Sequence, residues 1–397
     1  MGAASAHVGV MDTPFASLDQ DACYRAVTTR DARFDGRFFG CVKTTGIYCR
    51  PVCPARTPWR ENMSFVVTAA AAEEAGFRAC LRCRPETAPE MGAWRGTSNT
   101  VSRALSLIEA GALDGHGPGG ADVETLAGRL GVGERQLRRL FRQHLGAAPI
   151  SVAQTRRVLL AKQLIQETDL PMAQVALAAG FGSIRRFNET FQSLYGRSPS
   201  ALRRRQEKSG DGAEQVSAAV GVRLGLSYRE PYDRQAMLAA LAERGDRVEA
   251  GLWSRPLSLE IDGAEGRVAV RFGKPGRVEV TVEASDIRVL PAVLARVRRV
   301  FDLSADPEAI AQDLGRDPQL KPLVAARPGL RLAGQWRDDG LEAPSDRLDE
   351  AFDASRLGRM EAWRPWRAYG LLHLRATGKS LKDLQHDLEQ DDEKHAA

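Results

Sequence analysis

The placement of the cysteines constrains this chain more than any other feature. Six cysteines occur among 397 residues, too few for a disulfide scaffold, and four of them form two close pairs. Three residues separate the members of the first pair, two separate the members of the second, and 26 residues lie between the pairs. Two close pairs joined by a loop can supply four tetrahedral thiolates to Zn²⁺. The spacing predicts a zinc site, in a reducing compartment, formed by Cys49, Cys53, Cys80 and Cys83.

Length and hydropathy exclude several classes of protein. A chain of 397 residues is too long for one ordinary core and predicts roughly two to four domains. No apolar run approaches the roughly 18 residues needed to cross a bilayer, so no membrane is expected among the partners. Residues 1–10 lack a basic region followed by a long apolar stretch, so secretion is not expected. These patterns favour a cytoplasmic protein.

The charge of the chain is distributed unevenly. Residues 22–90 carry 11 Lys and Arg against 7 Asp and Glu, and residues 101–206 carry 15 against 8. Residues 207–397 carry 29 against 33. The positive field of the first half suits a polyanion. Charge alone leaves open the alternative that these arginines are solvated surface residues with no such partner.

Changes of composition divide the chain into units. Residues 85–100 mix Pro, Gly, Ser and Thr, and residues 206–216 are polar with Gly, which is typical of linkers. Apolar and polar residues alternate in three segments, which predicts strands at 257–261, 267–272 and 277–283. An amphipathic pattern predicts a helix at 291–301. We expect domains at residues 15–90, 100–206, 217–301 and 302–380, followed by an acidic tail at 381–397.

The residues around the first cysteine pair carry a specific resemblance. Residues 43–56 (KTTGIYCRPVCPAR), 60–62 (REN) and 76–83 (GFRACLRC) closely resemble the N-terminal domain of Ada-type adaptive-response proteins. The resemblance implies that Cys49 is both a zinc ligand and a methyl acceptor, which takes a methyl group from a methylphosphotriester in the DNA backbone. It assigns the other three ligand positions to Cys53, Cys80 and Cys83.

This chemistry is physically sound at a zinc–thiolate site. Thiolate rather than thiol is the nucleophile, and zinc keeps the sulfur deprotonated at neutral pH. A methylated phosphate is neutral, so a site with a formal charge of about −2 can approach it, and methyl transfer changes that charge to about −1. Because contacts to phosphate are largely electrostatic, DNA affinity should rise on methylation. The acceptor is consumed in a single turnover.

Basic side chains near the cysteines are candidates for holding the DNA backbone. These candidates are Arg50, Arg56, Arg60, Arg78 and Arg82. Each of them could equally be a solvated arginine that does not contact DNA. The resemblance favours Thr45 and Arg56, because both match family positions near the acceptor. The remaining cysteines, Cys23 and Cys41, have no pair partner and are predicted to be buried structural thiols.

The middle of the chain shows the pattern of two helix-turn-helix units. In each unit, apolar residues recur at helical spacing on both sides of a glycine, Gly131 in the first and Gly180 in the second. Residues 181–203, with the stretches FGS, FN and GRSPSALR, resemble the AraC/XylS-type DNA-binding domain, and the match covers about residues 101–205. The resemblance implies that the second helix of each unit enters the major groove.

The exposed residues of those two helices are the candidates for contact with bases, because Arg and Gln can read base edges. They are Arg135, Gln136 and Arg139 in the first helix, and Arg185, Arg186 and Asn188 in the second. We expect about half of them to touch only phosphate or solvent. The expected partners are double-stranded DNA, at its methylated backbone and at promoter sites, and RNA polymerase, which implies a nucleoid-associated protein.

The last third of the chain carries another resemblance. Residues 226–233 (LSYREPYD), the alternating strands, and residues 301–307, 327–331 and 363–369 resemble AlkA-type 3-methyladenine DNA glycosylases. Such enzymes carry a helical segment with a helix-hairpin-helix motif before a catalytic aspartate, but here only nine residues separate Trp336 from Asp346. Asp346 is a possible remnant of that aspartate, although a surface role is favoured. Without the rest of the pocket a flipped base has no site, so base excision is not expected.

Together these patterns predict a multidomain α+β protein. Its parts are a small zinc-bound α/β domain, an all-α double helix-turn-helix domain, and an AlkA-like α+β domain with an incomplete helical glycosylase part. The favoured function is a sensor of DNA alkylation and transcriptional regulator, which acts through irreversible methyl transfer to Cys49. The alternatives are a zinc-stabilised regulator without methyl chemistry, and a bifunctional regulator and DNA-3-methyladenine glycosylase.

Overall fold

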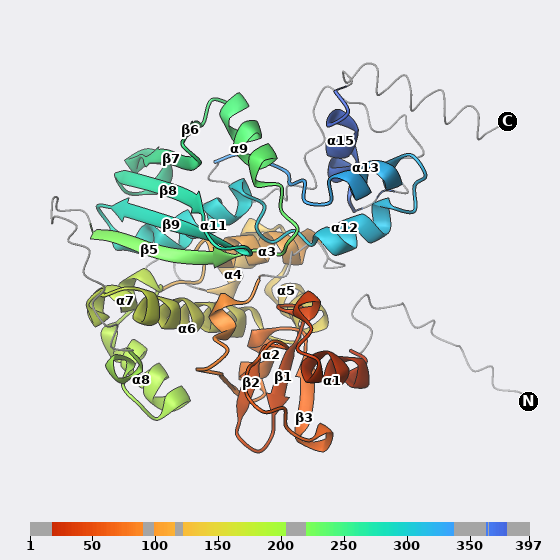
Figure 1. Cartoon of the computed structure of the whole chain (residues 1–397). Helices are drawn as coiled ribbons and strands as arrows, with labels where there is room; N and C mark the ends of the chain where they lie inside the picture. Colours follow the sequence, from red (N-terminus) through yellow and green to blue (C-terminus); the bar gives the residue numbers. More distant parts are fainter. Residues whose placement is uncertain are drawn as a thin grey trace, which may run out of the picture.

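The chain folds into three units that pack against one another (Figure 1). The computed structural model describes residues 18–89, 99–115, 122–203, 220–336, 363 and 365–378. Among these residues, no helix combines the length and the apolar character that a membrane span requires. Asp346 and the acidic tail at 381–397 lie outside the described residues.

The first unit is a small sheet with helices packed against it. Its strand order is β3-β1-β2-β4, in which β2 and β4 are parallel and the other neighbours are antiparallel. Strand β1 is buried along its whole length, because the core contains Phe38, Phe65 and Cys23 on one side and Tyr48 on the other. The elements are α1 (Gln20–Thr28), η1 (Ala32–Phe34), β1 (Phe39–Val42), β2 (Ile47–Cys49), η2 (Arg60–Asn62), β3 (Met63–Val66), α2 (Ala69–Glu74), β4 (Arg78–Ala79) and η3 (Pro85–Thr87).

The second unit is entirely helical and contains the two expected helix-turn-helix segments. Gly131 and Gly180 adopt φ of +68° and +90°, a conformation that glycine reaches without steric strain, so each makes the tight turn between its helices. A long helix, α6, joins the two segments. The elements are α3 (Asn99–Glu109), α4 (Val123–Arg129), α5 (Glu134–Leu145), α6 (Pro149–Glu167), α7 (Met172–Ala178), α8 (Ile184–Tyr195) and η4 (Pro199–Leu202).

The third unit is a five-stranded antiparallel sheet with helices beside it. Its strand order is β5-β9-β8-β7-β6, and alternate residues of β9 (Val278, Val280 and Val282) are buried. The predicted helix at 291–301 is present as α11, and the predicted strands at 267–272 and 277–283 are present as β8 and β9. The elements are β5 (Val220–Ser227), α9 (Arg234–Glu243), β6 (Arg247–Glu249), β7 (Leu252–Leu257), α10 (Leu259–Asp262), β8 (Gly266–Phe272), β9 (Arg277–Ala284), η5 (Ile287–Val289) and α11 (Leu290–Val300).

One strand prediction was wrong. Residues 257–261 do not continue as a strand, because β7 ends at Leu257 and the short helix α10 follows. Ser258 caps this helix by accepting a hydrogen bond from the backbone N–H of Ile261, and Gly263 ends it with a φ of +73°. Local capping therefore overrides the alternating pattern.

A small helical group follows the sheet. It contains α12 (Pro307–Leu314), α13 (Leu320–Ala326) and α15 (Arg367–Arg375), which enclose Trp363 and Trp366. The indole N–H groups of these tryptophans donate to Asp317 and Asp313, both at 2.8 Å. Asp302 is buried beneath this group and accepts a hydrogen bond from the Tyr369 hydroxyl, and burial raises its pKa to about 6. Packing among these described residues shows that the helical group has its own core.

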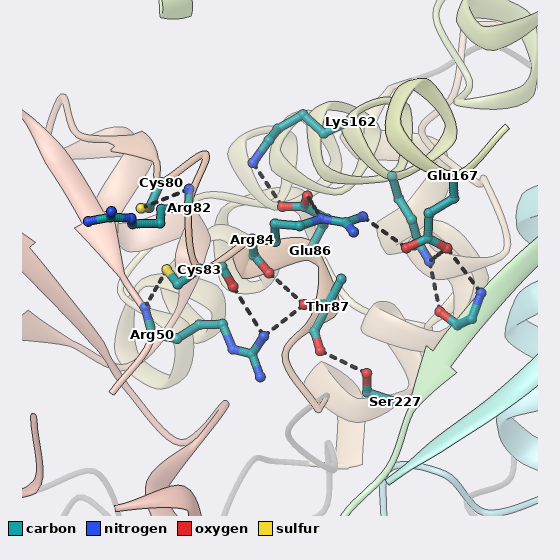
Figure 2. Close-up of polar contacts among 12 residues, drawn as sticks. Arg50, Cys80, Arg82, Cys83, Arg84, Glu86, Thr87, Lys162, Glu167 and Ser227 are labelled. Atoms are coloured by element: carbon teal, nitrogen blue, oxygen red, sulfur yellow. Dashed lines mark hydrogen bonds and ion pairs between the residues drawn. The ribbon is translucent and has the colours of Figure 1, made fainter. Parts of the chain in front are cut away.

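Helix α6 is the element on which all three units meet (Figure 2). The Lys162 ammonium lies 2.8 Å from a Glu86 carboxylate oxygen, and both side chains are only 1% exposed. One turn further along, Glu167 pairs with Arg84 of the first unit at 2.8 Å and with Arg277 of the third at 2.9 Å. Because Lys162 and Glu86 are enclosed, the loss of Lys162 leaves the buried Glu86 carboxylate with fewer positive partners.

Replacement of Lys162 by Met should lower the free energy of unfolding by up to about 3–5 kcal/mol, because Glu86 loses one of its cationic partners inside the protein. Urea unfolding followed by circular dichroism measures this change. The double replacement Lys162→Met and Glu86→Leu should recover most of the loss. The matched control is Lys321→Met, which removes an exposed lysine of α13. Equal stability of the Lys162→Met and Lys321→Met variants would contradict the expectation.

Candidate metal centre and nucleic-acid interface

The four predicted ligands converge on one point in the first unit. The Sγ atoms of Cys49, Cys53, Cys80 and Cys83 all lie within 4.8 Å of one another. Tetrahedral zinc with Zn–S bonds of about 2.3 Å requires sulfurs about 3.8 Å apart, so this donor set fits the metal with little adjustment. The cluster is made only of thiols, which are the ligands of structural and thiolate-reactive zinc sites.

Strand pairing brings the two cysteine pairs together. Strands β2 and β4 run parallel with Tyr48 opposite Ala79, so Cys49 and Cys80 leave the same edge of the sheet. The Cys80 N–H donates to the Tyr48 carbonyl at 3.0 Å, and the Cys53 N–H donates to the Arg50 carbonyl at 3.1 Å, which closes the turn of the first pair. The site therefore forms at the ends of two rigid strands.

Two of the sulfurs accept hydrogen bonds from the backbone. The Arg50 N–H donates to Cys83 Sγ at 3.4 Å, and the Arg82 N–H donates to Cys80 Sγ at 3.3 Å. Such bonds withdraw electron density from a thiolate and fix its position. They make Cys80 and Cys83 weaker nucleophiles than a sulfur without them.

Exposure also distinguishes the four ligands. Cys53, Cys80 and Cys83 are 7–8% exposed, whereas Cys49 is half-buried. Cys49 is therefore the ligand that a large substrate reaches most easily. The unpaired thiols Cys23 and Cys41 are buried, as expected, and burial raises their pKa to about 11 and about 12. Both stay protonated at neutral pH and are poor nucleophiles.

The basic residues near the cysteines fall into two groups. Arg56, Arg82 and also Thr45 are exposed. Arg60 pairs with Asp21 at 2.9 Å, and the half-buried Arg78 places its guanidinium 5.9 Å from the ring of Tyr195. Contact of Thr45, Arg56 and Arg78 with DNA remains a prediction.

Arg50 has a structural role that the sequence did not reveal. Its guanidinium forms an ion pair with Asp35 and also donates to the Cys83 carbonyl at 3.2 Å and to the Thr87 hydroxyl at 2.7 Å. Arg50 therefore faces into the protein and joins the two ligand loops, so it is not free to hold a phosphate. Nothing in the local sequence links Arg50 to Asp35 or Thr87, because these contacts depend on the tertiary fold.

Tyr48 supplies another connection that sequence reasoning missed. Its hydroxyl donates to Glu73 at 3.0 Å, and the Thr155 hydroxyl of α6 donates to the other Glu73 oxygen at 2.7 Å. Burial raises the pKa of Glu73, while these two hydrogen bonds lower it in part. Strand β2, which ends at Cys49, is thereby joined to the helical unit.

The second helices of the two helix-turn-helix segments present the expected residues to solvent. Arg135, Gln136 and Arg139 are exposed on α5, and Arg185, Arg186 and Asn188 are exposed on α8. Leu137, Phe141, Phe187 and Phe191 are buried on the opposite faces. Arg185 also pairs with Glu189 at 2.8 Å, both largely exposed, so that pair is readily broken by a competing phosphate. The geometry leaves these side chains available to a groove.

A cavity lies between the three units but does not reach the cysteines. Its volume is about 270 Å³, and its mainly apolar lining includes Phe39, Leu105, Leu160, Leu226 and Leu294. None of the four cysteines lines it. The cysteine cluster therefore does not open into this cavity.

Three families of known domains match the chain. The metal binding domain of Ada matches residues 22–86, a helix-turn-helix domain matches residues 126–205, and the AlkA N-terminal domain matches residues 223–337. The chain therefore contains a zinc-binding domain of the Ada type, an AraC-type helix-turn-helix domain and an AlkA N-terminal domain. The predicted zinc cofactor, the resemblances and the fold class are confirmed, and the roles of the individual residues stay predictions.

Several curated relatives have names that combine two functions. The "Probable bifunctional transcriptional activator/DNA repair enzyme AlkA" of Mycobacterium tuberculosis is 42% identical over 318 residues, which cover 79% of this chain and 62% of the relative. The "Bifunctional transcriptional activator/DNA repair enzyme Ada" of Escherichia coli is 34% identical over 164 residues, which cover 41% of this chain and 43% of the relative. The "Bifunctional transcriptional activator/DNA repair enzyme AdaA" of Bacillus subtilis is 27% identical over 190 residues, which cover 47% of this chain and 84% of the relative. The chain thus spans less than two thirds of the first two relatives.

Zinc content should depend on the clustered cysteines and not on the others. We expect about one zinc ion per chain, and replacement of Cys53, Cys80 or Cys83 by Ser should remove most of it because a hydroxyl is a poor zinc ligand. Metal analysis of the purified variants measures this. Cys23→Ala is the matched control and should keep its zinc. Full zinc content in the Cys80→Ser variant would contradict the assignment.

Proposed function

We propose that the chain senses alkylated DNA by accepting a methyl group at Cys49 from a methylphosphotriester. The observation that carries this proposal is the unequal exposure of the four cysteines whose sulfurs converge. Cys49 is half-buried, whereas its three partners are buried and two of them accept backbone hydrogen bonds. A purely structural site would gain nothing from leaving one ligand accessible. The match to the metal binding domain of Ada supports the same reading.

The transfer balances without any further reactant. The Cys49 thiolate attacks the methyl carbon, a sulfur–carbon bond forms as the carbon–oxygen bond breaks, and the electron pair stays on the phosphate oxygen. Zinc, when bound, keeps the four sulfurs deprotonated at neutral pH. The products are a thioether and an ordinary phosphodiester, which is a good leaving group. Since a thioether is no longer a thiolate nucleophile, the acceptor works once.

The transfer also changes the charge that faces DNA. Loss of one formal negative charge at Cys49 reduces its repulsion of the phosphate backbone, which raises DNA affinity. The exposed residues of α5 and α8 then bind promoter DNA, and the chain activates transcription of repair genes through RNA polymerase at the nucleoid. The match to a helix-turn-helix domain supports the DNA-binding step.

Base excision is not part of the proposed function. The AlkA N-terminal domain matches residues 223–337, and Asp346, the possible remnant of a catalytic aspartate, lies outside the described residues. The expectation that this chain does not excise bases stays a prediction. Release of 3-methyladenine from methylated duplex DNA, lost in an Asp346→Asn variant, would contradict it.

Methyl uptake can be measured by mass. Incubation with methylated duplex DNA should add about 14 Da to the peptide that contains Cys49, the difference made by one CH₂ group. The Cys49→Ser variant should not gain this mass, whereas Cys23→Ala should gain it fully. Zinc-loaded wild-type protein that gains no mass would refute methyl transfer and favour a regulator without methyl chemistry.

Promoter binding should depend on the exposed faces of α5 and α8. Replacement of Arg135 or Arg186 by Ala should weaken sequence-specific binding by roughly tenfold, in line with the loss of a base contact. Fluorescence anisotropy with a selected high-affinity duplex measures the change. Arg271→Ala, on the exposed face of β8, is the control and should bind as the wild type does. If all three variants bind alike, these helices do not read DNA.

A further inference from the structure

The side chain of Arg50 is fixed from several directions, although it directly follows the methyl acceptor. Asp35 pairs with its guanidinium. The Thr87 hydroxyl also accepts from the guanidinium at 2.7 Å, and the Cys83 carbonyl accepts at 3.2 Å (Figure 2). The Arg50 backbone N–H also donates to Cys83 Sγ. A displacement of Arg50 would therefore move the loop that begins at Cys49 and weaken the hydrogen bond at Cys83.

The AlkA-like sheet holds both side-chain partners of Arg50. The Ser227 hydroxyl, at the end of β5, donates to the Thr87 carbonyl at 2.8 Å. The buried Arg229 guanidinium, two residues further on, donates to the Asp35 carbonyl at 3.3 Å. One short segment of the third unit thus fixes both residues that fix Arg50.

The turn after Asp35 is also enclosed, by Pro89 of its own unit and by residues of the C-terminal half of the chain. A Cβ atom added at Gly36 would lie 2.0 Å from the Pro89 carbonyl oxygen and 3.2 Å from the Arg229 guanidinium, so only glycine fits there. The neighbouring Arg37 pairs with Asp306 at 3.1 Å and with Glu308 of α12 at 2.6 Å. The position of this turn therefore depends on the third unit and on the helices after it.

We propose that the AlkA-like unit is a positioning partner of the methyl-acceptor site. Through Ser227 and Arg229 it holds Thr87 and Asp35, and through them the Arg50 side chain and the loop of Cys49. Methyl transfer at Cys49 then requires the AlkA-like unit in its docked position, and this role needs no base excision. The inference rests on the proposed methyl transfer. If the AlkA-like unit were docked by apolar packing alone, two of its donors, Ser227 and Arg229, would not be expected to contact the two partners of Arg50.

The experiment compares the rate of methyl uptake in variants of the full chain. Ser227→Ala and Arg229→Gln should each slow methyl transfer from methylated duplex DNA to Cys49 by about fivefold, the effect of losing one hydrogen bond, and zinc content should be unchanged. Arg50→Lys should slow it further, because lysine cannot reach three partners. The rate is measured by mass on the Cys49 peptide. Arg271→Gln, on the same sheet, is the control.

Rescue by a conservative variant and the zinc content distinguish positioning from a general loss of structure. Ser227→Thr keeps the hydroxyl and should therefore transfer methyl at the wild-type rate. If Ser227→Ala were slow only because packing is disturbed, Ser227→Thr would be slow as well. Wild-type rates in both Ser227→Ala and Arg229→Gln would overturn the inference, as would slowing only in proportion to lost zinc. No methyl uptake by the wild-type protein would instead refute the proposed function itself.

Discussion

Four sulfur atoms that converge on one point are the constraint on which this structure depends. As thiolates they would repel one another, so they can all be deprotonated together only when a divalent metal balances their charge. The loops that carry the four sulfurs follow the paired strands β2 and β4, and Arg84 and Glu86 come shortly after Cys83 in the sequence. Those two residues make the buried ion pairs with α6. Order at the metal therefore extends to the helical unit, because ligands and docking residues share one short segment.

The four cysteines of the cluster differ in exposure, and this difference distinguishes a metal-holding role from a reactive one. Three buried cysteines can hold a metal for as long as the fold lasts, while half-buried Cys49 remains open to a substrate on the surface. The recognition helices are exposed as well, and they belong to the unit against which the first unit is docked through α2 and α6. In the proposed function, a damaged phosphate and a promoter would meet parts of one packed assembly, because the first unit and the recognition helices are joined through α2 and α6.

Much of this arrangement could be predicted from the sequence, and the remainder could not for physical reasons. Cysteine spacing identified the ligands because metal geometry leaves few alternatives, and glycine placement at Gly131 and Gly180 identified the turns. The inward orientation of Arg50 could not be predicted, because its partners Asp35 and Thr87 are distant in the sequence and meet only after folding. The strand expected at 257–261 failed because a single capping residue, Ser258, outweighed an alternating pattern. The burial of Lys162 could not be predicted either, because lysine is ordinarily a surface residue.

The contact between α6 and β5 has a consequence for solubility. Strand β5 forms one edge of its sheet, and an uncovered edge offers backbone groups to any other chain in extended form. Here Gln163 donates to the Gly225 carbonyl at 2.8 Å and Glu167 accepts from the Gly225 N–H at 3.1 Å, so side chains of a helix take the place of a missing strand. The helical unit thereby occupies the backbone groups of this edge at Gly225, within β5 (Val220–Ser227), and hinders self-association there. Separated from it, the sheet would carry an aggregation-prone border.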